Sequence, residues 1–255
     1  MLQQTQAPRV VPVYVAFLRR FPTVIALARA PRRAVLRAWA GLGYNRRAVA
    51  LSEAARRIVR DHAGRVPETR QALEGLPGVG PYTAAAVASL AFGVPAAAVD
   101  TNVRRVVARV HLGVEPHEAP RGEVETAADA WLDRRDPGAW NSAVMDLGRE
   151  VCRPRPRCGI CPLASACRFR ASGAVGTPGP RRQGPFEGST RQVRGAVVGA
   201  LRERPTLTLA GLSCQTAFEL ERIVACLPGL VDDGIVHAGP AALAGRSSGR
   251  VRLAT

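Results

Sequence analysis

The stretch Leu76-Pro77-Gly78-Val79-Gly80-Pro81-Tyr82, followed twenty residues later by Val99-Asp100-Thr101-Asn102, decides how this chain is interpreted. Gly78 and Gly80 predict a tight turn with uncovered backbone N–H groups, because glycine tolerates φ > 0 and has no Cβ. Pro81 suits the first position of the next helix, where no N–H donor is needed. Bare amides before a helix N-terminus form an anion site, so Gly78, Val79 and Gly80 are predicted to bind phosphate. An ordinary turn between two helices is the alternative.

The composition indicates a polyanionic partner. The 255 residues carry a net charge of +16, and all 36 basic residues are Arg. Such a balance favours DNA through phosphate neutralisation and counterion release. The sequence shows neither an apolar run of transmembrane length nor a signal-peptide pattern, so we expect no membrane partner and a cytoplasmic, nucleoid-associated protein. Without Lys, the chain has no side-chain amine that could form a Schiff base with an opened sugar.

Hydrophobic periodicity predicts a mainly α-helical protein with a different module at its C-terminus. Helical spacing recurs through residues 10–151, and residues 173–185 are predicted to be a Pro/Gly-rich linker. After the linker, the order of helix, short strand, helix and two strands is typical of a small winged-helix-like α+β module. The predicted domains are therefore 1–95, 96–172, the linker 173–185 and the module 186–255.

Four of the six cysteines are clustered and predict a metal centre: Cys152, Cys158, Cys161 and Cys167. Zinc sites commonly use two Cys-x-x-Cys pairs, and only one is present, so an all-thiolate iron–sulfur cluster fits better. The loop after the first cysteine carries Arg153, Arg155 and Arg157, which are predicted to contact phosphates, with solvated charge as the alternative. Cys214 and Cys226 lack partners at metal spacing and are expected to be buried apolar fillers.

The hairpin and Asp100 together resemble the helix-hairpin-helix DNA glycosylases, and other segments resemble the A/G-specific adenine DNA glycosylases within that superfamily. These segments are Met1-Leu2-Gln3-Gln4-Thr5-Gln6, Leu42-Gly43-Tyr44 and Asn141-Ser142-Ala143-Val144-Met145-Asp146-Leu147-Gly148. The cysteine spacing is similar to the family's [4Fe–4S] loop, but five residues rather than six separate Cys152 from Cys158. The resemblance covers residues 1 to about 169 and implies a six-helix barrel plus an iron–sulfur cluster domain.

The resemblance also implies a role for each site residue. Asp100 would stabilise the oxocarbenium-like sugar, and Asn102 would order the catalytic network; the alternative for Asp100 alone is a helix N-cap. Tyr82 stands where related enzymes carry a Schiff-base Lys, which indicates a monofunctional enzyme. Residues that would enter the duplex and contact the opposite oxidised guanine are Gln3, Gln4, Thr5 and Tyr44. Core packing for Tyr44 and Tyr82, and helix-terminal polarity for Gln3, Gln4 and Thr5, are the alternatives.

The general acid that the resemblance implies is missing from the sequence. Adenine needs a proton to leave, and the family supplies it from a Glu two residues before the Met that is Met1 here. The first acidic residue of this chain is Glu53. We therefore expect an N-terminally truncated form in which excision is impaired, with a native start upstream. A genuine short form that binds A/G lesions with little excision activity is the alternative.

The function predicted is base-excision repair, in which a monomer flips out and removes adenine paired with 8-oxoguanine or guanine in double-stranded DNA. A thymine or uracil mismatch DNA glycosylase of the same fold is the second hypothesis, and a non-catalytic lesion-binding protein is the third. The expected cofactor is a [4Fe–4S] cluster.

Overall fold

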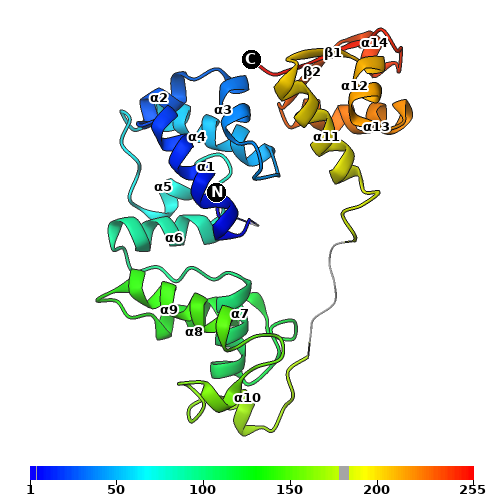
Figure 1. Ribbon diagram of the computed structural model, residues 1–255. Coiled ribbons are helices and arrows are strands. Elements are labelled where there is room, and N and C mark those ends of the chain that lie inside the picture. Colours follow the sequence, from blue (N-terminus) through cyan, green and yellow to red (C-terminus); the bar gives the residue numbers. More distant parts are fainter. Residues whose placement is uncertain (4, 178–183) are drawn as a thin grey trace. The chain divides into compact units, whose positions relative to one another are not determined.

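The computed structural model describes residues 1–3, 5–177 and 184–255 and contains two compact units (Figure 1). Unit 1 consists of Met1–Val66 with Gln183–Thr255, and unit 2 consists of Pro67–Arg182. In the described ranges, no helix combines the length and the apolar character that crossing a bilayer requires. The domain ranges expected from the sequence stay a prediction, and part of the expected linker lies outside the described residues.

The first half of unit 1 is a group of helices that pack around one apolar core. Their bounds are α1 (Ala7–Arg20), α2 (Val24–Arg29), α3 (Arg32–Ala38) and α4 (Arg46–Asp61). Thr23 caps α2 by accepting a hydrogen bond from the Ala26 amide. The core includes Phe17, Leu36 and Trp39, which are almost completely buried. Helix α4 could be predicted from the sequence because its buried residues recur at helical spacing.

The C-terminal half of unit 1 has the predicted winged-helix order with two additional short helices. Its elements are α11 (Thr190–Glu203), β1 (Thr206–Thr208), α12 (Leu209–Thr216), α13 (Leu220–Asp232), β2 (Val236–Ala238), α14 (Pro240–Leu243) and β3 (Arg250–Leu253). The strands form an antiparallel sheet in the order β1-β3-β2. One helix was expected between the first two strands and two are present, because the Thr208 hydroxyl caps α12 directly after β1 and Ala217 ends it at φ 57.

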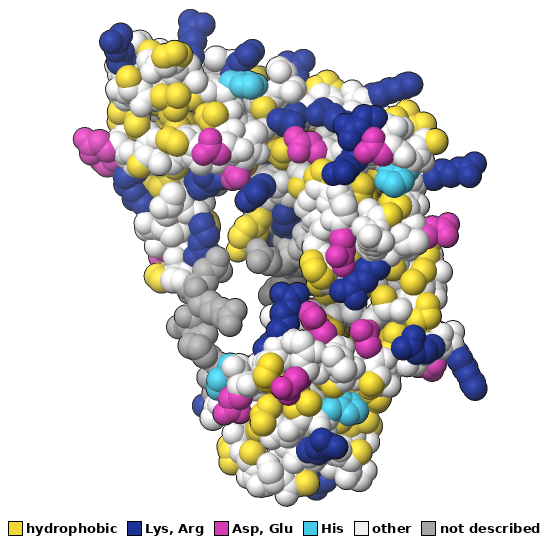
Figure 2. Space-filling model, turned by 180° about the vertical axis from the view of Figure 1, so that it is seen from behind, with side chains coloured by type: hydrophobic (Ala, Val, Ile, Leu, Met, Phe, Trp, Pro, Cys, Tyr) yellow, Lys and Arg dark blue, Asp and Glu magenta, His cyan; other side chains and the backbone are white. Residues whose placement is uncertain are grey.

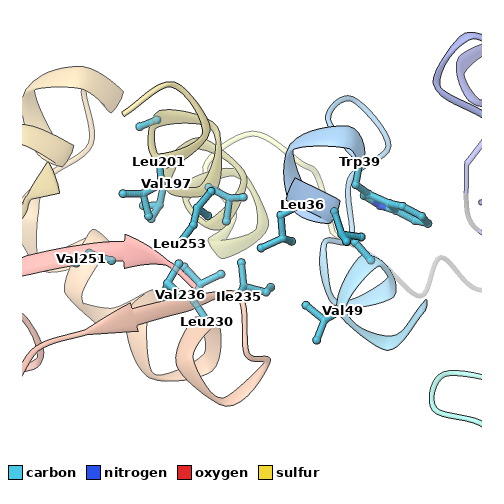
Figure 3. Close-up of a cluster of buried hydrophobic side chains, with 14 of the residues drawn as sticks. Leu36, Trp39, Val49, Val197, Leu201, Leu230, Ile235, Val236, Val251 and Leu253 are labelled. Atoms are coloured by element: carbon cyan, nitrogen blue, oxygen red, sulfur yellow. The ribbon is translucent and has the colours of Figure 1, made fainter. Parts of the chain in front are cut away.

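The two halves of unit 1 share a single hydrophobic core. Leu36, Trp39 and Val49 come from the N-terminal helices, and the facing side chains come from the C-terminal module (Figure 3). Leu201, Leu230 and Ile235 are each at most 2% exposed. Cys226 is buried in this core as expected, but the same expectation is wrong for Cys214, which is exposed. The module is therefore an integral part of unit 1, because the apolar area that it buries against α3 and α4 would otherwise meet water.

Unit 2 holds the predicted hairpin and the cysteine region. Its elements are α5 (Arg70–Glu74), α6 (Pro81–Phe92), α7 (Thr101–Val107), the π-helical turn η1 (Ala108–Leu112), α8 (Arg121–Trp131), α9 (Pro137–Glu150), the 3₁₀ turn η2 (Cys158–Ile160) and α10 (Arg168–Ala171). A second core fills the space between α7, α8 and α9, with Val103, Val106 and Val124 fully buried. The predicted fold class, mainly α with a small C-terminal α+β module, is confirmed.

Candidate functional site

The hairpin turn connects α5 to α6 as the sequence predicts. Gly78 has φ 75, which only glycine adopts without strain, and the Val79 amide donates to Leu76 O at 3.1 Å. Gly80 is the N-cap of α6, and Pro81 occupies its first turn. A Cβ placed on Gly80 would meet no atom within 4 Å, so the turn presents an open face. This open turn at a helix N-terminus has the geometry of an anion site.

Asp100 is the N-cap of α7, and its carboxylate is held at both oxygens. Oδ1 accepts hydrogen bonds from the Asn102 amide at 2.8 Å and the Val103 amide at 2.7 Å. Oδ2 accepts from Asn102 Nδ2 at 3.2 Å. The capping alternative is therefore correct as a structural role, and it also fixes the carboxylate in one orientation. A side chain that is only half buried keeps its remaining lone pairs available for a ligand.

A chain of hydrogen bonds links Asp100 to the start of the cysteine loop. Arg105 Nη2 donates to Asn102 Oδ1 at 2.9 Å and to Gly148 O at 2.6 Å, and its Nε donates to Cys152 O at 2.6 Å. A Cβ on Gly148 would lie 2.8 Å from Asn102 Cβ, so only glycine allows this approach of α9 to α7. Arg105 thereby supports Asn102, which in turn supports Asp100.

Asn141 fixes the segment that leads into Asp100. It is fully buried, and its Oδ1 accepts from the Ala98 amide at 2.7 Å. Its Nδ2 donates to Ala96 O and Pro137 O, each at 2.9 Å, and to Ser89 Oγ at 3.0 Å. The amide is thus satisfied on both sides, as a buried polar group requires. It holds residues 96–98 against α6 and α9, and so it sets the position of Asp100.

Tyr82 lies in the first turn of α6 and is electrostatically coupled to Asp100. Burial is the larger cause that raises the pKa of the Tyr82 hydroxyl, and the Asp100 charge raises it further. The hydroxyl donates to Met145 Sδ at 3.9 Å, and the residue is 37% exposed. Tyr82 is thus near enough to Asp100 to be affected by its charge, and it lies only partly in the core. Its hydroxyl stays protonated at neutral pH.

The four clustered cysteines line one pocket in unit 2. The other walls are apolar side chains and three arginines: Val106, Val110, Leu147, Val151, Pro156, Ala164, Phe169, Arg109, Arg157 and Arg170. Among the described residues, no three His, Cys, Asp or Glu side chains converge as a single metal ion requires. A cuboidal cluster does not need such convergence, because each thiolate binds a different iron. The donor set of four thiols around an apolar pocket fits a [4Fe–4S] cluster.

Burial and a neighbouring charge act in opposite directions on the first of these cysteines. Burial is the largest cause and raises the pKa of the Cys152 thiol, while Arg109 lowers it through a contact from Nη1 at 3.8 Å and through its charge. Thiolate is the form that binds iron. Arg109 therefore favours the charged state in a pocket that would otherwise disfavour it.

Arg109 also organises the loop between Cys152 and Cys158. It is 1% exposed and forms two hydrogen bonds to Glu115, at 2.8 Å and 3.0 Å. Its Nη1 donates to Arg153 O at 2.6 Å, and its Nη2 donates to Pro154 O at 2.9 Å. Glu115 Oε1 additionally accepts from the Thr177 amide at 3.1 Å. One buried ion pair thus holds the first cysteine loop and the chain that leaves unit 2.

The three loop arginines differ in their surroundings. Arg153 donates to Arg149 O at 3.1 Å and pairs with Glu150 at 3.3 Å. Arg155 and Arg157 are exposed and form no ion pair within the described part of the chain. These two are therefore better placed than Arg153 to contact phosphates.

The N-terminal site residues lie in unit 1 and are gathered by Arg47. The guanidinium donates to five oxygens: Met1 O (2.9 Å), Gln3 O, Thr5 Oγ1 (2.8 Å), Leu42 O (2.9 Å) and Gly43 O (3.4 Å). It also lies over the rings of Trp39 and Tyr44. Gln4 lies outside the described residues.

The turn that carries Tyr44 is brought to the N-terminal segment. Thr5 Oγ1 donates to Leu42 O at 3.2 Å, and Tyr44 has φ 44 and is 43% exposed. A left-handed conformation in an aromatic residue is uncommon and is retained where the surroundings enforce it. The core-packing alternative does not describe Tyr44, because nearly half of its surface is in solvent.

Sequence reasoning missed the residues that support this site, namely Arg47, Arg105, Arg109 and, as a positioning residue, Asn141. One signal was present: Arg105 and Arg109 are four residues apart and so share a helix face. In a chain with 36 Arg and Lys residues, that spacing alone does not distinguish buried arginines from solvated ones.

Comparisons with known proteins agree with this geometry. Residues 1–132 match the family described as "HhH-GPD superfamily base excision DNA repair protein". The adenine DNA glycosylase of Mycolicibacterium smegmatis is 40% identical over 250 residues, which cover 96% of this chain and 85% of that protein. The structure of a thermostable thymine-DNA glycosylase is similar to this chain, with a TM-score of 0.62 and 32% sequence identity. The similar region covers 67% of this chain and 80% of the glycosylase chain. A non-covalent endonuclease III–DNA complex is similar with a TM-score of 0.59 and 28% identity, covering 68% of this chain and 80% of that one.

Proposed function

The chain belongs to the HhH-GPD superfamily of base excision DNA repair proteins and is an adenine DNA glycosylase, and from this premise we propose how its residues perform the reaction. The family assignment makes it an N-glycosylase that removes adenine and binds DNA. The predicted helix-hairpin-helix glycosylase fold is confirmed by the same comparisons. The pairing partner of the adenine, the residue roles and the cofactor are the proposal.

The substrate proposed is a duplex with adenine opposite 8-oxoguanine or guanine. A mispaired base costs less free energy to unstack, which favours its extrusion. Gln3, Gln4, Thr5 and Tyr44 would contact the opposite base, and Arg47 gathers three of these four through contacts of its guanidinium. Gly78, Val79 and Gly80 would bind a backbone phosphate at the open turn before α6. Arg155 and Arg157 would add phosphate contacts at the cysteine loop, with a smaller part for Arg153.

Asp100 is the observation that carries the mechanism. When the bond between the sugar C1′ and the adenine nitrogen breaks, the electron pair leaves with the base and the sugar gains positive charge. A carboxylate fixed by the Asn102 and Val103 amides is oriented before the charge develops, so it stabilises the cation without reorganising. Asn102 acts as a positioning residue, and Arg105 holds Asn102 in turn. Tyr82 is proposed to line the same site.

The absence of Lys from the sequence supports a monofunctional reaction. Cleavage of the DNA backbone through a Schiff base requires an amine nucleophile, so water is the nucleophile proposed here. Adenine needs a proton to leave, and we assign that step to no residue of this sequence.

A [4Fe–4S] cluster is proposed as the cofactor, held by Cys152, Cys158, Cys161 and Cys167. It would supply folding free energy to the cysteine loop, since metal binding and folding of such loops are coupled. The loop is one residue shorter than the family pattern, and Arg109 closes it by binding the carbonyls of Arg153 and Pro154. We propose a monomer that acts at the nucleoid, where its substrate is.

The test is single-turnover excision on four matched duplexes carrying A:8-oxoG, A:G, T:G and A:T. We expect adenine release from the first two duplexes only, at an impaired rate, with no strand cleavage without added alkali and no DNA adduct trapped by borohydride. Asp100→Asn should lower the excision rate by about 10²–10³-fold, the range for removal of one group that stabilises transition-state charge. Excision of thymine from T:G alone would favour the second hypothesis and overturn the adenine assignment.

A second arm tests the proton donor. The 255-residue chain is compared with the same chain carrying Ser-Glu-Val before Met1, and with a Ser-Gln-Val control. Excision that is fast only with the added Glu supports a carboxyl donor at that position. Equal rates for all three chains would contradict it, and tight binding without excision by all three would favour the lesion-binding hypothesis.

A further inference from the structure

The C-terminal module is joined to the N-terminal half of unit 1 by contacts from α11 and from the C-terminal end of α13. Gly234 O, just after α13, accepts from Arg32 Nη1 at 3.2 Å, and Asp233 pairs with Arg46 at 3.5 Å. Arg202 on α11 donates to Leu36 O at 3.0 Å and to Asn45 Oδ1 at 2.6 Å. With the shared core, these contacts join the module to the N-terminal half of unit 1, which carries Thr5, Tyr44 and Arg47.

The outward face of α13 is unsuited to a phosphate backbone. In a winged-helix module, the helix at this position is the one that commonly enters DNA. Here Glu219, Glu221 and Asp232 are exposed on or beside it. The exposed basic residue Arg222 donates to Gly188 O at 2.7 Å and lies over the Phe218 ring. Negative charges beside phosphates repel them, so this helix is not a DNA contact.

The outward face of the sheet has the opposite character. Along β3, the exposed Arg250 and Arg252 alternate with the buried Val251 and Leu253, so both arginines point to the same side. The strand register places Thr206 and His237 on either side of Arg252. These four exposed residues, Thr206, His237, Arg250 and Arg252, are called the wing face below.

The charges of the wing face are not neutralised within the protein. Neither arginine of the wing face forms an ion pair in the described ranges, where the ion pairs of unit 1 involve other arginines. Glu203, three residues before Thr206, accepts a hydrogen bond from Gln215 Nε2 at 2.8 Å, and Asp233, four residues before His237, pairs with Arg194. Arg246, between β2 and β3, is also exposed and adds positive charge to the same hairpin. Figure 2 shows Arg side chains projecting from much of the protein face that it draws, which fits a surface of high net charge.

We propose that the wing face is an additional binding surface for the phosphate backbone of duplex DNA. Side chains two residues apart on a strand are about 7 Å apart, close to the rise of two nucleotides along one DNA strand. Guanidinium, imidazole and hydroxyl groups are all phosphate donors, and none of them reads a base edge from a backbone position. The wing face therefore adds affinity without sequence preference. Duplex DNA is the polyanion proposed because the same compact unit carries the residues expected to contact the mispair.

The experiment compares the full chain with Arg250→Gln/Arg252→Gln and with Arg222→Glu. Both variants lower the net charge by the same amount, but Arg222 lies on α13, away from the wing face. Dissociation constants for one undamaged and one A:8-oxoG duplex of identical length are measured over a series of salt concentrations. Thermal unfolding of each variant verifies that the module remains folded.

The double variant should lower the salt slope by about two, one for each phosphate that the wing face no longer neutralises, and weaken binding of both duplexes to the same degree. Arg222→Glu should leave the slope unchanged. The inference is overturned if the double variant binds as the wild type does, or if Arg222→Glu weakens binding equally, since net charge alone would then explain the effect. A wild-type chain that binds both duplexes but excises nothing would count against the proposed function and leave the wing-face comparison intact.

Discussion

Two arginines each gather a functional segment, one in each unit, and they are stabilised in different ways. Arg109 in unit 2 is 1% exposed and binds the Glu115 carboxylate through two hydrogen bonds. Arg47 in unit 1 contacts carbonyl and hydroxyl oxygens and two aromatic rings, and no carboxylate lies within ion-pair distance in the described ranges. Burial lowers the pKa of Arg47, since its charge is desolvated without a counter-ion.

The difference indicates two distinct roles. A buried charge with its own counter-ion contributes little field outside the pair, so Arg109 acts by holding backbone. An unneutralised guanidinium keeps its positive potential, so Arg47 both holds backbone and attracts phosphate. Unit 2 would then depend on its arginine for stability, and unit 1 would depend on its arginine for recognition. The predictions below test this difference, beginning with the largest effect.

Arg109→Met should destabilise unit 2 by about 3–5 kcal/mol, because it leaves Glu115 buried without a partner. It also removes the donors to Arg153 O and Pro154 O. Urea unfolding followed by fluorescence of Trp131 and Trp140, both in unit 2, measures the decrease in stability. Iron content and the rate at which a chelator removes the cluster provide a second readout on the cysteine loop.

The control is Arg109→Met combined with Glu115→Leu. Replacing both charges of a buried pair by apolar groups is often neutral or stabilising, so the double variant should recover much of the unfolding free energy. It should not recover iron retention, because the loop carbonyls still lack donors. A double variant as unstable as the single one would show that packing, rather than charge, explains the role of Arg109.

Arg105→Lys should lower the excision rate by about 10–100-fold while leaving DNA affinity unchanged. Lysine keeps the charge but lacks the planar fork that reaches Asn102, Gly148 and Cys152 together. Without its hydrogen bond from Arg105, Asn102 would let Asp100 shift, and small misplacements of a catalytic group have effects of this size. Single-turnover rates and dissociation constants, measured separately, distinguish this from a binding defect. Arg104→Lys, on the same helix, is the control.

Those parts of the site that depend only on residues close together in the sequence could be predicted. The conformations of a helix N-cap and of a Gly/Pro turn depend on neighbouring residues, so both Asp100 and the hairpin were predicted correctly as local structures. Arg105 and Arg109 were missed, because their burial depends on how closely α9 approaches α7 at Gly148. Arg104 and Arg105 look equivalent in sequence, yet only Arg105 reaches Asn102. Helix α12 was missed because its cap, Thr208, also ends a β-prone run.

Arg47→Lys should reduce the preference for 8-oxoguanine over guanine opposite adenine by about tenfold, which corresponds to about 1.4 kcal/mol. A lysine cannot bind Gln3 O, Thr5 Oγ1 and Leu42 O at once, so the N-terminal segment would no longer be fixed against Tyr44. Competition binding with A:8-oxoG and A:G duplexes measures the preference.

Arg57→Lys, also on α4 but partly exposed and paired with Asp61, is the control for Arg47→Lys and should not change the preference. If Arg47→Lys instead lowered stability as much as Arg109→Met, the two arginines would have the same role. The proposed division between stability in unit 2 and recognition in unit 1 would then be wrong.

Tyr82→Phe should have the smallest effect and raise the activation free energy of excision by less than about 1 kcal/mol. The reason is that the Tyr82 hydroxyl donates only to a thioether sulfur, which is a weak acceptor. The raised pKa of Tyr82 means that the phenol is protonated, and its contribution present, at every pH up to and beyond its ordinary value of about 10. The pH–rate profiles of wild type and Tyr82→Phe should therefore run parallel from acid to mildly alkaline pH. An alkaline decline in the wild type that the variant lacks would show that the hydroxyl proton takes part in excision. Tyr82 would then belong with Asp100 in the chemistry, and unit 2 would supply more than a rigid support for one carboxylate.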